Sequence, residues 1–200
     1  MCFQLEVETS NWNVMLKNAR HVSVDYSAIH LSRSNKFKNP KLRTLKVVDK
    51  NQSKRGNEER PRFDIPSDMM KKMGYLRVFV LCDYGIVELS KNIKLLEHLR
   101  CLNLSHNTIE ALSDEVCKLL ALQILKLRKC NDLKNLPKDL TKLVNLHQLD
   151  IDIGNLTEKS SQLGKLTVLQ FLEKKFVQNM NGHRIEEYEI SRGFIDNIES

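Results

Sequence analysis

The chain has 200 residues, of which 41% are apolar, and it carries a formal net charge of +7. This length suits one domain with a continuous core, and no apolar run reaches the roughly 20 residues that a transmembrane helix needs. The first residues lack the basic and apolar stretches of a signal peptide, so we expect a cytoplasmic protein, with the nucleus as the alternative location.

The residue types that carry enzyme and metal chemistry form no constellation. The five cysteines are an odd number without a CxxC pair, which argues against a disulfide framework or a zinc ribbon and favours reduced, mostly buried thiols. The six histidines form no HExxH motif, and the chain has no nucleophile motif or paired carboxylates in register. We therefore expect no catalytic residue, no metal site and no cofactor.

Residues 1–18 precede the first repeated segment. They contain Trp12, Val14 and Leu16, whose apolar side chains suit packing against the end of an array. We expect this stretch to form an N-terminal flank or cap.

From residue 19 onward, the chain repeats segments of the form LxxLxL at intervals of 23, 34, 23, 23, 24 and 23 residues. In a strand, the first, fourth and sixth positions of such a segment face the core and the others face solvent. Further apolar positions recur in the same register, so that Ile86 and Leu96 have counterparts in Ile109 and Leu119. The segments begin at Ala19, Leu42, Leu76, Leu99, Leu122, Leu146 and Leu169.

A single unit of this length cannot bury its leucines, so such units stack with their strands parallel. The pattern predicts an α/β leucine-rich-repeat solenoid, with a curved parallel β-sheet on the concave side and short helices and turns on the convex side. The predicted array covers residues 19–176 in about seven units. Asn107 and Cys130 stand where such repeats place a side chain that bonds to backbone groups left unpaired at the bend.

The long interval contains an insertion at residues 49–64, whose charges, Gly56 and Pro61 predict a solvated loop. A short helix should follow, with Met70 and Met73 facing inward and Gly74 ending it in a left-handed conformation. Residues 177–200 match no unit, and we expect an irregular acidic tail there.

The repeats include LEHLRCLNLSHNTIEALSDEVCKLLALQILKLRKCNDLKNLPKDLTKLVNLHQLDI at residues 96–151, with ARHVSV at 19–24, KLRTL at 41–45, YLRVFVL at 75–81 and GKLTVLQFL at 164–172. In these segments the chain resembles the leucine-rich-repeat region of plant nucleotide-binding, leucine-rich-repeat disease-resistance proteins of the coiled-coil type. Members of that family sense pathogen effectors inside the cell, where the repeat region contacts the effector or a guarded host protein and restrains a nucleotide switch.

The chain also departs from that family. Its seven glycines include no GxxxxGK[ST] phosphate loop, so we expect no nucleotide to bind and interpret the chain as a truncated receptor. Ser90, Ser113 and Ser160 stand where the family usually has the proline of an LP pair, which is kept only at Leu136 and Pro137.

The solvent-facing strand positions form the expected binding surface, with a purely solvated face as the other interpretation. The resemblance implies a protein partner, which is a pathogen effector, a guarded host protein or other domains of the receptor. Nucleic acid is not expected, because the basic stretch at residues 33–62 has no interleaved aromatic residue beyond Phe37. The predicted partner-binding residues are Arg77, Val80, Arg100, Asn103, His106, Gln123, Lys126, Arg128, His147 and Asp150.

The alternative function is that of a general intracellular leucine-rich-repeat scaffold for signalling complexes. Such scaffolds also use 23-residue units, but they normally keep the LP pair and an asparagine at nearly every turn. The four central units here have one LP pair and one such asparagine, which favours the receptor hypothesis.

Overall fold

The computed structural model describes residues 2–4, 19–25, 41–48, 67–152, 156–157 and 171–172. The predicted loop at 49–64, the predicted tail at 177–200 and residues 5–18 of the predicted flank lie outside these ranges. No helix in the described part of the chain combines the length and hydropathy that crossing a bilayer requires.

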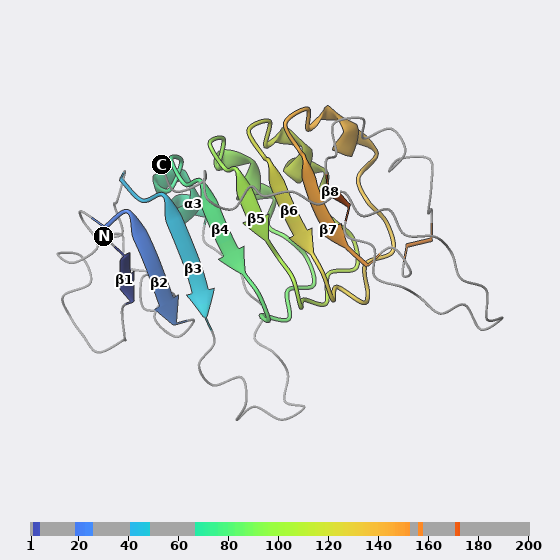
Figure 1. The fold of residues 1–200 in the computed structure, drawn as a ribbon, viewed down its shortest axis with the longest axis horizontal. Coiled ribbons are helices and arrows are strands. Elements are labelled where there is room, and N and C mark those ends of the chain that lie inside the picture. The colour runs from blue at the N-terminus through green and yellow to red at the C-terminus, as the bar shows by residue number, and fades with distance from the viewer. Residues whose placement is uncertain are drawn as a thin grey trace, which may run out of the picture.

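Eight parallel strands form one sheet and lie side by side in sequence order (Figure 1). Seven of them begin two residues after the start of an LxxLxL segment, so the periodicity located them correctly. This arrangement confirms the predicted solenoid. The seven strands are β2 (His21–Asp25), β3 (Thr44–Val48), β4 (Val78–Leu81), β5 (Cys101–Asn103), β6 (Ile124–Leu127), β7 (Gln148–Ile151) and β8 (Phe171–Leu172).

The remaining strand, β1 (Cys2–Gln4), lies within the predicted flank. It pairs with β2 in parallel, with Cys2 opposite His21. The repeat pattern did not predict this strand, because its residues form no LxxLxL segment. Its pairing covers backbone groups along the edge of β2. The role of residues 1–18 as a cap stays a prediction.

Short helices connect the strands: α3 (Ser67–Lys72) and the 3-10 helices η2 (Lys91–Leu95), η3 (Asp114–Lys118) and η4 (Lys138–Lys142). Ser90 and Ser113 begin η2 and η3, and each hydroxyl accepts a hydrogen bond at 3.3 Å from the amide two residues later. Pro137 occupies the same position before η4 and makes no side-chain cap. A serine cap therefore favours the start of the helix through a hydrogen bond, whereas the proline of the LP pair favours it by fixing its own backbone angle φ.

The predictions for the first of these helices are confirmed in part. Met70 and Met73 face inward and are each 1% exposed. Gly74 is not left-handed, which corrects the predicted helix end, whereas Gly85 is left-handed with φ of 60°. The turn after α3 repeats the turn after η2, where Leu99 N donates to Leu96 O. Its equivalent positions in later units hold glutamate, leucine and valine, so it needs no glycine.

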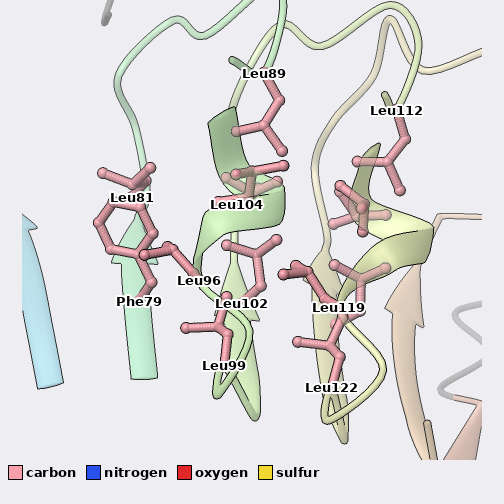
Figure 2. Close-up of a cluster of buried hydrophobic side chains, with 14 of the residues drawn as sticks. Phe79, Leu81, Leu89, Leu96, Leu99, Leu102, Leu104, Leu112, Leu119 and Leu122 are labelled. Carbon is pink, nitrogen blue, oxygen red and sulfur yellow. The ribbon is translucent and has the colours of Figure 1, made fainter. Parts of the chain in front are cut away.

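The core is a stack of equivalent leucine rows. Figure 2 shows Phe79 and Leu81 of β4 in one buried cluster with Leu102 and Leu104, which occupy the equivalent positions one unit later. Each fully buried side chain of this kind contributes about 1.5 to 3 kcal/mol. The inward positions that the periodicity predicts are confirmed by their burial; in the four central units they are Leu76, Phe79, Leu81, Leu99, Leu102, Leu104, Leu122, Leu125, Leu127, Leu146, Leu149 and Ile151.

Asn107 connects two units through the bend that follows the strands, as predicted. Its Oδ1 accepts hydrogen bonds from the Tyr84 and Ile86 amides at 2.9 and 3.1 Å. Its Nδ2 donates to the carbonyls of Leu81 and Leu104, both at 2.7 Å. The Cys130 thiol, one unit later, donates to Leu104 O at 3.3 Å. These side chains pair backbone groups that would otherwise be buried without partners.

Candidate functional site

We call the side of the sheet that bears the outward strand positions the open face; it corresponds to the predicted concave surface. Its side chains alternate with the core residues, so strands β4 and β6 show a half-buried, buried, half-buried, buried order. Nine of the ten predicted partner-binding residues lie there or just past the strand ends and are half-buried: Arg77, Val80, Arg100, Asn103, His106, Gln123, Lys126, Arg128 and His147.

The tenth predicted residue, Asp150, is only 8% exposed. Its neighbours along the sheet, Lys126 and Asn103, keep half-buried side chains, although the register places all three in one row. A carboxylate that is covered to this extent offers little surface to a partner. Solvent exposure at Asp150, which the alternation predicts, is therefore a wrong expectation, because the alternation fixes the face and not the depth of each side chain.

Four arginines form one row on the open face, which we call the arginine row: Arg20, Arg43, Arg77 and Arg100. Consecutive members are joined by backbone hydrogen bonds of 2.7 to 2.8 Å, from each amide to the carbonyl of the arginine before it. Gln123 and His147 continue the row through the same bonds at 2.8 and 3.0 Å. Neighbouring strands lie about 4.8 Å apart, so this geometry holds four like charges side by side.

The charges of the arginine row act on one another. Partial burial lowers the pKa of Arg77 below its ordinary value, and the charges of Arg100, Arg43 and Arg20 lower it further. Among the described residues, neither Arg77 nor Arg100 has a carboxylate within ion-pair distance. Each adjacent pair at such spacing repels by up to about 1 kcal/mol in water. An acidic partner would relieve this repulsion.

A second row runs parallel to the first. The register aligns Lys46, Val80, Asn103 and Lys126 across β3 to β6. Lys46 was not among the predicted residues, although its spacing from Val80 follows the strand register. The Asn103 side chain accepts a hydrogen bond from the Ser105 amide at 3.0 Å, so it shapes the strand end as well as facing outward. The two lysines extend positive charge beyond the arginine row.

His106 and Arg128 lie just past the ends of β5 and β6, and the His106 amide donates to Arg128 O at 2.8 Å. The His106 Nδ1 lies 3.6 Å from Asp83 Oδ1 in the preceding unit. Asp83, His106 and Lys129 occupy equivalent turn positions, and all three have positive φ, of 66°, 62° and 56°. The backbone of His106 is thus set by its turn, and its ring lies beside Asp83.

The cysteines offer no ready nucleophile in the described part of the chain. Burial raises the pKa of the Cys117 and Cys130 thiols from an ordinary 9.0 to about 11. Burial also raises the pKa of the half-buried Cys82 and Cys101. The described residues likewise contain no cluster of three or more histidine, cysteine, aspartate or glutamate side chains placed to hold a metal ion.

Alkylation kinetics will check these thiols. A rise in pKa from 9.0 to about 11 lowers the thiolate fraction at pH 8 about 100-fold. We expect iodoacetamide to label Cys117 and Cys130 in the folded protein about 100-fold more slowly than in urea, with the folded rate rising until pH exceeds about 11. Peptide mass spectrometry separates the sites. Equal labelling rates in the two states would contradict the burial of these thiols.

Sequence reasoning missed one group of exposed residues next to the arginine row. Tyr75, Leu120 and Val144 are 56%, 57% and 64% exposed and occupy the turns that lead into β4, β6 and β7. The LxxLxL pattern constrains the positions that pack inward and says nothing of these turn positions. The one available signal was an apolar residue within three positions before a residue of the row, as Tyr75 stands before Arg77.

Comparisons with known proteins agree with this geometry. A family model described as a leucine-rich repeat region matches residues 37–189, which is more than half of the chain. Among curated proteins, none matches closely enough to count as a relative.

The chain is also similar to a number of solved structures, two of which are described next. An internalin of Listeria monocytogenes has 18% sequence identity and a TM-score of 0.49, over 69% of this chain and 36% of the internalin. A leucine-rich-repeat protein of Leptospira interrogans has 18% identity and a TM-score of 0.42, over 82% of this chain and 56% of the Leptospira chain. The chain thus spans less than two thirds of either protein. The family match over residues 37–189, on a sheet in which seven strands begin within LxxLxL segments, shows that the chain belongs to the leucine-rich repeat family.

Proposed function

We propose that this chain is a protein-interaction module that binds a protein partner on the open face of its sheet. The arginine row is the observation that carries this proposal. It places four cations side by side directly before the starts of β2 to β5, and neither Arg77 nor Arg100 is neutralised by a carboxylate of the described residues. Preorganised charge of one sign favours the capture and orientation of an acidic surface. We propose no catalytic, nucleotide-binding or cofactor role.

We propose further that the module acts in plant intracellular immunity, as the repeat region of a disease-resistance receptor. The amino-acid sequence of the repeats from LEHLRCLNL onward, which resembles that receptor family, supports this role. The partner would then be a pathogen effector, a guarded host protein or another domain of the receptor, in the cytoplasm or the nucleus. A general signalling scaffold shares the fold, and the hydrogen bonds of Asn107 serve either kind of protein equally.

A pull-down from leaf extract tests the binding face. We expect the variant Arg77→Glu with Arg100→Glu to lose its protein partners by at least about tenfold, because it reverses the charge at the centre of the row. The matched control is Lys91→Glu with Lys138→Glu, which makes the same change in charge at exposed positions of η2 and η4. It should keep those partners.

Unchanged partners in the arginine variant would contradict binding on the open face. Loss of the same partners in both variants would show that net charge, and not this surface, controls binding. Identification of the captured protein separates the receptor role from the scaffold role, because a defence component supports the former and a general signalling enzyme the latter.

A further inference from the structure

The turns that lead into the strands form a second surface beside the arginine row. We call it the strand-start edge and define it by the turns at residues 73–75, 97–98, 120–121 and 144–145. These turns have one geometry, because Leu76, Leu99, Leu122 and Leu146 each donate from the backbone amide to a carbonyl three residues earlier, at 2.8 to 3.0 Å. They follow one another along the upper edge of the sheet in Figure 1.

Exposed apolar side chains gather on this edge. The described residues include four large apolar side chains that are exposed, and three of them, Tyr75, Leu120 and Val144, belong to the strand-start edge. The fourth, Val87, lies beyond the other end of β4 and is 41% exposed. These three side chains do not belong to the core, so their apolar surface stays open to solvent in the described structure.

The edge is held in place by contacts between successive turns. The Tyr75 ring stacks on the His98 ring with centroids 5.3 Å apart and planes 7° from parallel. The Arg43 guanidinium lies 5.6 Å from the centroid of the Tyr75 ring and donates to Tyr75 O at 3.4 Å. Further along, Asn145 Nδ2 donates to Leu120 O at 2.8 Å. An ordered aromatic side chain loses little entropy when it is buried by a partner.

The strand-start edge meets the arginine row at Tyr75 and His98, whereas Leu120 and Val144 lead into Gln123 and His147, which continue the row. Tyr75 precedes Arg77 by two residues, and His98 precedes Arg100 by two. Arg43 belongs to the row by its backbone bonds and reaches the edge with its side chain. Aromatic side chains and arginine are the residues most enriched in the buried centres of protein interfaces.

We propose that the strand-start edge and the arginine row form one docking surface for an acidic amphipathic protein segment, whose apolar side chains cover Tyr75, Leu120 and Val144 while its carboxylates lie over the row. This inference deepens the proposed function and rests on it. It names the chemistry of the partner and extends the contact surface to a set of residues outside the ten predicted ones.

Other occupants fit the surface less well. In a twofold pairing of two copies, the same patch meets itself, so the like-charged arginine rows would be brought close together. A nucleic acid would neutralise the row, but its bases need open aromatic faces for stacking. The faces of the Tyr75 ring already meet His98 and Arg43, so the edge of the ring is the part that is open to a partner. An apolar side chain can cover that edge, whereas a base cannot stack on it, and Leu120 and Val144 offer no stacking surface.

Fluorescence anisotropy with three labelled peptides tests the chemistry of the partner on the full chain. One peptide alternates glutamate with leucine, the second contains glutamate alone, and the third alternates lysine with leucine. We expect the first to bind about tenfold more tightly than the second, because only the first can cover the apolar edge. The third should not bind detectably, because its charge matches that of the row.

Two variants and a control assign the binding to residues. The edge variant, Leu120→Gln with Val144→Gln, should weaken the binding of the glutamate and leucine peptide about tenfold and leave the binding of the glutamate peptide unchanged. Arg77→Glu with Arg100→Glu should abolish the binding of both. Val87→Gln, which removes the exposed apolar side chain outside the edge, should change neither.

Three outcomes would overturn the inference. The edge variant could bind the glutamate and leucine peptide as well as wild type does, or a single-stranded oligonucleotide could bind more tightly than that peptide. Sedimentation could also reveal a dimer that the edge variant abolishes, which would make a second copy the occupant. A different result would contradict the proposed function: the arginine variant keeps its partners in the leaf pull-down, although the peptides bind as expected.

Discussion

Replacement of Asn107 by alanine is expected to lower the free energy of unfolding by at least about 3 kcal/mol, measured by urea denaturation. The side chain is 2% exposed and bonds to backbone groups of two units. Without it, the amides of Tyr84 and Ile86 and the carbonyl of Leu81 lose a buried partner, and each such loss costs about 1 to 3 kcal/mol. The carbonyl of Leu104 still accepts a hydrogen bond from the Cys130 thiol.

Two further substitutions calibrate this result. Asn145→Ala removes one exposed hydrogen bond, to Leu120 O, and should cost less than about 1 kcal/mol. Asn107→Cys places the residue type of the equivalent position, Cys130, whose thiol donates one bond, to Leu104 O, and is a weaker donor and acceptor than a carboxamide. The loss of unfolding free energy for Asn107→Cys should fall between the losses for Asn145→Ala and Asn107→Ala. If Asn107→Ala costs no more than Asn145→Ala, the bend does not depend on this side chain.

The substitution Phe79→Ala is expected to cost about 3 to 5 kcal/mol, because the ring is fully buried and its loss leaves a cavity beside the leucine rows (Figure 2). The matched control is its neighbour, Val80→Ala. Val80 points to the open face and is half-buried, so this change should cost no more than about 0.5 kcal/mol. Urea denaturation measures both. Similar costs for the two variants would contradict the strand register.

The sequence predicts the inward half of this molecule well because burial is periodic. An apolar residue at the first, fourth or sixth position of a segment packs into the core, so the starts of β2 to β8 and the burial of Phe79 could both be derived. The role of Asn107 could be derived for a similar reason, since a buried polar side chain at a bend must pair with nearby backbone groups.

The outward half follows weaker rules. The alternation places Asp150 on the open face, yet its 8% exposure depends on how the surrounding side chains lie over it. The stacking of Tyr75 on His98 depends on two turns that lie 23 residues apart in sequence and side by side in space. Neither turn position is constrained by the core, so no periodic signal marks either residue.

Backbone conformation at the turns was also beyond the pattern. Glycine is the residue expected at positive φ, but Asp83, His106 and Lys129 adopt it in three successive units while Gly74 does not. Repetition of the conformation at a spacing of 23 residues shows that the solenoid bend imposes it. The predicted site residue His106 is therefore placed by the bend, and its contact with Asp83 follows from that placement.

Site-specific photo-cross-linking in leaf extract tests the central claim, that a protein partner binds the open face, most directly. A benzoylphenylalanine replaces Val80 on the open face in one variant and Lys138 at the start of η4 in another. Our account predicts that a partner protein is cross-linked at Val80 and not at Lys138. Cross-links at Lys138 with none at Val80 would contradict it.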